Sequence, residues 1–150
     1  FMAHHECPAM IKSMLSLYND AIHTDNVFFR FLCLYKIFDV FFCGDNNSIK
    51  TWMNDNLKLV CDKSDYIERK VRNLNQNNIG YYLYKNFRNA IAHAHLGKIK
   101  AGKLGLMSYN PEDFGKAFEA CEILKALVEC LIEKELDRFD REGINVIKEV

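Results

Sequence analysis

The residues best suited to chemistry lie together in segment 84–95, which reads Tyr-Lys-Asn-Phe-Arg-Asn-Ala-Ile-Ala-His-Ala-His. Four residues separate Arg88 from His93, and Asn89 directly follows the arginine. An imidazole, with an ordinary pKa of about 6.5, can remove a proton from a 2′-hydroxyl or protonate a 5′-oxygen leaving group. A guanidinium can hold phosphate oxygens and stabilise the charge that develops on them. The combination predicts RNA cleavage that needs no metal ion, with Asn89 orienting the imidazole or holding a phosphate oxygen.

We expect this segment to lie on a helix over about residues 79–94. At about 100° per residue, one side carries the core-facing residues Tyr84, Phe87, Ile91 and Ala94. The opposite, exposed face carries Lys85, Arg88, Asn89, Ala92 and His93. One helix offers a single arginine and a single histidine. Two copies related by a two-fold axis would bring two of each together, so we expect the site to be completed by a homodimer.

The charge pattern also favours a polyanionic ligand. The net charge is zero, but residues 69–111 contain eight Lys or Arg and no acidic residue. Such a single-sign stretch can attract RNA. The candidate RNA-binding residues are Lys85, His95, Lys98, Lys100 and Lys103. The alternatives are a solvated lysine loop and, for His95, a supporting role. Tyr81, Tyr82 and Tyr84 could stack bases, although aromatic residues at helical spacing are more often part of a core.

The remaining pattern predicts an all-α bundle of five to six helices. The expected helices span about 8–22, 27–42, 49–61, 65–75, 79–94 and 111–139. The last of these carries an apolar stripe that should face the core, made of Phe114, Phe118, Cys121, Leu124, Val128, Leu131 and Ile132. Helix 27–42 is apolar on nearly every side and should be central. Segment 96–107 is expected to be a loop, with a short β-hairpin as the alternative. We expect one domain over 1–150, with a core bundle over 8–139. The sequence also leaves open that this chain is a fragment of a longer protein.

Composition narrows the class of protein. Apolar residues make up 49% of the chain, which is enough for a core, and no apolar run is long enough to span a bilayer. The six cysteines form no C-x-x-C pair, and Cys33, Cys121 and Cys130 fall in apolar helical patterns. We therefore expect core thiols in a reducing cytoplasm. Residues 4–7, His-His-Glu-Cys, lack a spaced partner pair, so we expect no metal site and no cofactor.

The Arg88-Asn89-x-x-x-His93 pattern resembles the R-x4–6-H signature of the HEPN superfamily, including the polar residue after the arginine. The string Phe-Arg-Asn-Ala-Ile-Ala-His-Ala is similar to members grouped as Apea-like or MauJ-like HEPN proteins. The resemblance implies a four- or five-helix bundle and a dimeric, metal-independent ribonuclease of toxin–antitoxin, antiviral defence or RNA-processing systems. It implies functional roles for Arg88, Asn89 and His93. The glycine- and lysine-rich segment before the last helix departs from it.

The sequence leaves three hypotheses. In the first, the protein is a cytoplasmic hydrolase, an endoribonuclease that cleaves single-stranded RNA, with an antitoxin or an upstream domain as a further partner. In the second, the same face belongs to a non-catalytic HEPN module for dimerisation, RNA binding or sensing. In the third, the chain is a structural helical scaffold, and Arg88 and His93 are a surface arginine and a histidine that favours a helix dipole. A scaffold has no need of the acid-free segment.

Overall fold

The computed structural model describes residues 7–91 and 111–148, with side chains for residues 9–91 and 111–142. Within these ranges it contains helices and short turns and no strand. The helices are α1 (Cys7–His23), α2 (Val27–Phe41), α3 (Asn46–Lys63), α4 (Asp65–Leu74), α5 (Ile79–Tyr82), the π-helix η1 (Leu83–Asn89) that continues α5, and α7 (Pro111–Lys148). The predicted all-α bundle is confirmed. The alternative of a β-hairpin at 96–107 lies outside the described residues.

Side-chain caps explain most of the helix starts. The Asn26 side chain accepts hydrogen bonds from the N–H groups of Phe28 and Phe29, both at 3.0 Å, and so begins α2. Asp45 does the same for α3 by accepting from the N–H groups of Asn47 and Ser48. Because Asp45 satisfies these otherwise unpaired donors, α3 begins at Asn46. The expected start near residue 49 was therefore wrong by three residues.

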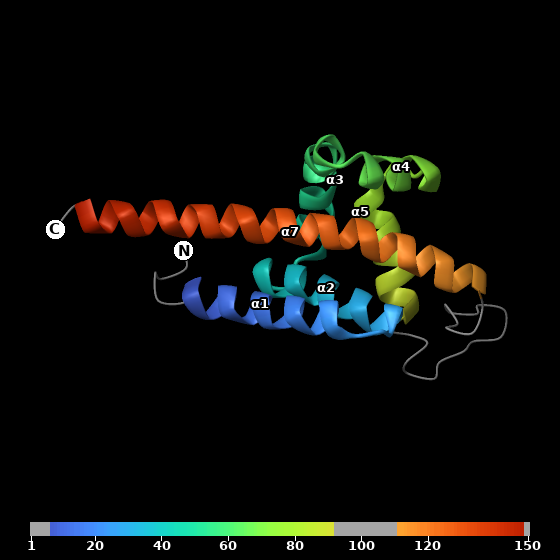
Figure 1. Cartoon of the computed structure of the whole chain (residues 1–150), viewed down its shortest axis with the longest axis horizontal. Coiled ribbons are helices and arrows are strands. Elements are labelled where there is room, and N and C mark those ends of the chain that lie inside the picture. The colour runs from blue at the N-terminus through green and yellow to red at the C-terminus, as the bar shows by residue number, and fades with distance from the viewer. Residues whose placement is uncertain (1–6, 92–110, 149–150) are drawn as a thin grey trace.

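Helix α2 is the centre of the bundle, as its composition predicts. Its buried residues are Val27, Phe31, Cys33, Leu34, Tyr35, Ile37 and Phe38. Helices α1 and α2 form an antiparallel pair, and α7 runs along the length of the molecule beside them (Figure 1). Helix α3 and the α5–η1 stretch cross α7 steeply (Figure 1). This crosswise stretch carries the predicted site, so its position is set by α3 on one side and by α2 and α7 on the others.

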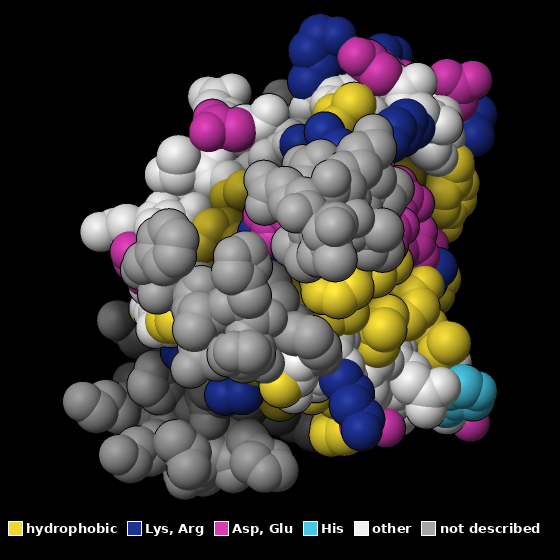
Figure 2. All heavy atoms as spheres, turned by 90° about the vertical axis from the view of Figure 1, so that its left-hand side faces the viewer, with side chains coloured by type: hydrophobic (Ala, Val, Ile, Leu, Met, Phe, Trp, Pro, Cys, Tyr) yellow, Lys and Arg dark blue, Asp and Glu magenta, His cyan; other side chains and the backbone are white. Residues whose placement is uncertain are grey.

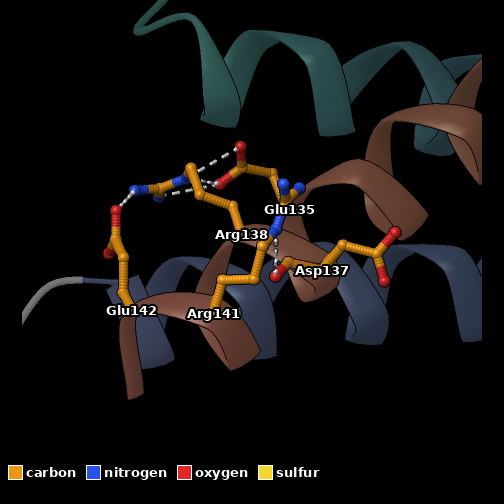
Figure 3. A network of polar contacts seen from close by, with 5 residues as sticks. All are labelled: Glu135, Asp137, Arg138, Arg141 and Glu142. Atoms are coloured by element: carbon orange, nitrogen blue, oxygen red, sulfur yellow. Dashed lines mark hydrogen bonds and ion pairs between the residues drawn. The ribbon is translucent and has the colours of Figure 1, made fainter. Parts of the chain in front are cut away.

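Helix α7 extends to Lys148, and the expected end near residue 139 was wrong. Arg138 binds both carboxylate oxygens of Glu135, one turn before it, and also binds Glu142, one turn after it, at 2.9 Å (Figure 3). In the same region the Arg141 Nε donates to the Asp137 carbonyl at 3.3 Å. Ion pairs at i,i+3 and i,i+4 favour the helical state. They therefore support helix beyond the last apolar residue of the predicted stripe.

The outer surface is mixed in charge on the face near the start of α1 and the end of α7. Lys, Arg, Asp and Glu side chains intermingle there, and hydrophobic side chains gather along one flank (Figure 2). Cys33, Cys121 and Cys130 are buried, which confirms that these thiols belong to the core. Burial raises the pKa of the Cys121 thiol to about 12. No helix among the described residues combines the length and apolar character that a bilayer crossing requires.

Candidate functional site

The helix that carries the predicted site consists of α5 and η1, and we call it the site helix. Its first turn is anchored to α3. A Cβ added to Gly80 would lie 2.6 Å from the Lys50 carbonyl oxygen, so the two backbones are in contact there. The Asn54 side chain accepts a hydrogen bond from the Gly80 N–H at 2.9 Å and donates one to the Asn78 side chain at 2.9 Å. Asn78 in turn caps the helix by accepting from the Tyr81 N–H. The start of the site helix is thus fixed by the backbone contact at Gly80 and by these hydrogen bonds. We call the hydrogen-bonded pair of side chains the Asn54–Asn78 clasp.

The site helix then widens into a π-helix at Leu83–Asn89. Ile79, Leu83, Phe87 and Ile91 are all buried. Residues four apart drift by about 40° per step around an α-helix, so Ile79 and Ile91 would face directions about 120° apart if the stretch were α-helical throughout. The wider i→i+5 turn reduces this drift and keeps the apolar residues on the core. Such π-segments frequently occur at functional sites, and this one contains Lys85, Arg88 and Asn89.

The structure partly agrees with the predicted faces of this helix. Phe87 and Ile91 are buried and Lys85 is exposed, as expected. Tyr84, expected to face the core, is half-buried, and so are Arg88 and Asn89, which were expected on the exposed face. The reason is the π-turn, which rotates these residues relative to an ideal α-helix. Ala92 and Ala94 lie outside the described residues.

Arg88 lies at a surface groove of about 400 Å³ between η1, α1 and α2. Its Nη1 donates to the Asn89 side-chain oxygen at 3.1 Å, and its guanidinium lies 5.8 Å from the centre of the Tyr84 ring. The residues that line the groove are both apolar and polar: Leu17, Asp20, Phe29, Leu32, Cys33, Tyr35, Lys36, Asp39 and Arg88. The arginine is therefore oriented by its neighbours and still borders open space.

Asp39 on α2 is an acidic group that lines the same groove as Arg88. Burial raises the pKa of the Asp39 carboxyl, while the positive charges of Arg88 and Lys36 lower it. The net direction is upward, so desolvation outweighs the attraction. The Tyr35 hydroxyl is buried beside these groups without a hydrogen-bond partner among the described residues, and its pKa is also raised, chiefly by burial.

A row of alternating cations and aromatic rings runs from Arg88 along the outer face of this helix. The Lys50 Nζ lies 4.9 Å from the Tyr84 ring centre and 5.9 Å from that of Tyr81. The Lys85 Nζ lies 5.5 Å from the Tyr81 ring centre. We call these five residues the cation–aromatic row. Sequence reasoning missed Lys50 because it belongs to α3, and only the contact at Gly80 brings it to the site helix.

Several predicted site residues fall in the part of the chain that is not described. These are the proposed catalytic His93 and the candidate RNA contacts His95, Lys98, Lys100 and Lys103. The structure brings Arg88 and Asn89 into contact through their hydrogen bond, and Lys85 lies on the same π-helix against the Tyr81 ring. Among the described residues no group of three or more His, Cys, Asp or Glu side chains could hold a metal ion. The cluster at residues 4–7 lies outside the described side chains.

The comparison with protein families identifies the family of the chain. The family model described as methylamine utilization protein MauJ matches residues 14–133. The chain belongs to the MauJ family. MauJ-like proteins belong to the HEPN superfamily, in agreement with the all-helical bundle. Neither the curated proteins nor the solved structures gave a match. The matched region includes α2, α3 and the whole site helix, together with most of the buried part of α7.

Proposed function

We propose that this MauJ-family chain is a metal-independent endoribonuclease that cleaves single-stranded RNA. The observation that carries the proposal is the position of Arg88. Its guanidinium is oriented by Tyr84 and Asn89 at the edge of a groove, on a π-segment, five residues before His93. An oriented guanidinium beside open space suits a phosphate group, because its planar fork can hold two non-bridging oxygens.

In the proposed reaction the 2′-hydroxyl attacks the adjacent phosphorus and the 5′-oxygen leaves. The proposed dimer supplies two His93 side chains as general base and general acid: one takes the proton from the 2′-hydroxyl, and the other gives a proton to the leaving 5′-oxygen. Arg88 stabilises the extra negative charge on the phosphorane. The products are a 2′,3′-cyclic phosphate and a 5′-hydroxyl. Asn89 positions Arg88 through their hydrogen bond.

The proposal places two copies of the chain around this site. The support is the groove itself, where the half-exposed Phe29 and the neighbouring Leu17 and Leu32 lie on the same surface as Arg88. Apolar side chains at a groove edge are suited to burial against a second copy. A symmetric contact there would bring the two Arg88 side chains toward one shared RNA strand. The proposed dimer predicts twice the monomer mass, about 35 kDa from a 17.5 kDa chain, by light scattering.

The test is cleavage of a 5′-labelled single-stranded RNA in the presence of EDTA. We expect His93→Ala to slow cleavage by roughly 100- to 10,000-fold and Arg88→Ala by roughly 100- to 1,000-fold. Arg72→Ala is the matched control, because Arg72 lies in the same acid-free segment but pairs with Glu68 on α4. It should cut at the wild-type rate. Equal cleavage by the wild type and His93→Ala would refute the proposal.

A second candidate function is RNA binding without cleavage. The cation–aromatic row favours it, since lysines and an exposed tyrosine can hold single-stranded RNA without any catalytic group. In that case RNA would bind with a steep dependence on salt concentration and stay intact.

The proposed nuclease acts in the cytoplasm, as the toxin of a toxin–antitoxin pair or as an antiviral defence effector. An antitoxin or an upstream domain would restrain it. Expression of the wild-type chain alone should then stop cell growth, whereas the His93→Ala variant should not.

A further inference from the structure

Beyond the cleavage site, the cation–aromatic row has the features of a nucleic-acid path. Lys50 on α3 and Lys85 on η1 both lie near the Tyr81 ring, at 5.9 and 5.5 Å from its centre, and the Tyr84 ring is near both Lys50 and Arg88. The row therefore ends at the proposed catalytic arginine. Tyr81 is 45% exposed, so part of its ring is open to solvent.

The two lysines of the row differ from most other described lysines in their partners. Lys58, Lys63, Lys70, Lys116 and Lys125 each pair with a carboxylate. In the part of the chain that the structure describes, neither Lys50 nor Lys85 has a carboxylate partner; both lie against tyrosine rings instead. Their charges are thus uncompensated by acids there and available to a phosphate backbone.

The fold holds this arrangement in place. Gly80 brings the site helix against the Lys50 backbone, and the Asn54–Asn78 clasp fixes the turn that carries Tyr81. The Tyr84 hydroxyl accepts a hydrogen bond from the Asn46 amide at 3.5 Å. Groups that the fold already holds in place lose little freedom when a ligand binds, which favours affinity.

We propose that Tyr81 is a stacking platform for an unpaired base, and that Lys50 and Lys85 contact the phosphates beside it, so that a single strand is led toward Arg88. This rests on the proposed function, because it names the path by which that substrate reaches the site. A duplex would bind more weakly, since its bases are already stacked and paired.

The test measures binding separately from cleavage. A fluorescein-labelled 2′-O-methyl RNA decamer lacks the attacking hydroxyl, so it reports affinity alone. We expect Tyr81→Ala and Tyr81→Leu each to weaken binding by roughly 5- to 150-fold, whereas Tyr81→Phe keeps it within about 2-fold. The slope of log affinity against log salt should fall by about 0.7 for each of Lys50→Ala and Lys85→Ala.

Tyr66→Ala is the matched control. Tyr66 on α4 is 42% exposed and also lies near a lysine, with the Lys70 Nζ 5.3 Å from its ring centre, but it is outside the row. It should bind the decamer like the wild type. Circular dichroism should confirm that every variant keeps the wild-type helix content.

The outcomes separate this inference from the nuclease proposal. Tyr81-dependent binding supports the platform even if natural RNA is not cut, in which case only the nuclease proposal fails. Cleavage that depends on His93, combined with unchanged binding by a folded Tyr81→Ala variant, overturns the platform and leaves the nuclease proposal standing. Equal losses for Tyr66→Ala and Tyr81→Ala, or no binding of the decamer at all, also overturn it.

Discussion

Substitution of Gly80 by alanine should disrupt the site from a distance. The added Cβ would meet the Lys50 carbonyl oxygen at 2.6 Å, the Lys50 Cα at 2.8 Å and the Lys50 carbonyl carbon at 3.0 Å. All three are backbone atoms of α3, so no side chain can rotate away to make room. The site helix must move off α3, which strains the hydrogen bond from the Gly80 N–H to Asn54.

The expected cost follows from overpacking, which typically destabilises a folded protein by about 1–3 kcal/mol. Because alanine is the better helix former by about 0.5–1 kcal/mol, the measured loss should fall toward the lower part of that range. In a domain of this size, 1 kcal/mol corresponds to about 2–4 °C in melting temperature. We therefore expect Gly80→Ala to melt about 2–8 °C below the wild type.

The assay is thermal unfolding followed by circular dichroism, with Gly115→Ala as the control. Gly115 lies in α7, and a Cβ added there would meet nothing within 4 Å. That variant gains helix propensity without a clash, so its melting temperature should equal or exceed that of the wild type. A melting temperature for Gly80→Ala at or above that of the wild type would refute the inferred backbone contact between α3 and the site helix.

Three further predictions follow from the surroundings of the site. The Asp39→Asn variant should be more stable than the wild type at pH 7. Burial raises the pKa of Asp39 in the folded state. The contribution of Asp39 to stability therefore falls as pH rises from its unfolded-state pKa, about 3.9, through its folded-state pKa. The free energies of unfolding of the two proteins, measured in urea, should become equal near pH 3. A stability difference of the same size at pH 3 and pH 7 would contradict this. Asn54→Ala should lower the free energy of unfolding by about 1–2 kcal/mol, because two hydrogen bonds of the clasp are lost; an unchanged urea midpoint would count against the clasp. The exposed Cys43 should react with a thiol reagent in the native state. Cys121 is buried and its pKa is raised to about 12, so it should react only on unfolding. Rapid labelling of Cys121 in the native Cys43→Ser variant would disprove this.

Much of the helical framework could be predicted from local signals. The apolar run of α2 and the proline at the start of α7 indicated these helices correctly, since cap and propensity effects act within one turn. The missed length of α7 is also local in origin, because the stabilising charges of Glu135, Arg138 and Glu142 follow the apolar stripe. A helix end judged from hydrophobic residues alone therefore came too early.

The predicted stripe of α7 was partly wrong for a reason that depends on packing. Phe114 and Phe118 were expected to face the core with Cys121 and Leu124, yet they are 45% and 38% exposed. Ala117 and Ala120 are fully buried in their place. Small residues permit a close approach of α7 to its neighbours, and a pattern based on side-chain size favours the phenylalanines instead.

The site could be predicted only as a set of residue types. The pattern of Arg88, Asn89 and His93 indicated the chemistry, but a 3.6-residue period could not indicate the π-segment that rotates Arg88 toward α2. Lys50 had no local signal at all, since its place in the cation–aromatic row results from a contact between two helices. Gly80 was the available signal, because a glycine inside a helical pattern often marks a close backbone approach.

The central claim is that Arg88 and His93 cleave RNA through the 2′-hydroxyl. The most direct measurement uses a labelled 2′-O-methyl strand with a single unmodified ribonucleotide, incubated with excess protein in EDTA. The account predicts one cut, on the 3′ side of that ribonucleotide, ending in a 2′,3′-cyclic phosphate, with a rate that falls roughly 100-fold or more in Arg88→Ala and His93→Ala. Cuts elsewhere in the strand, or equal rates for all three proteins, would contradict it.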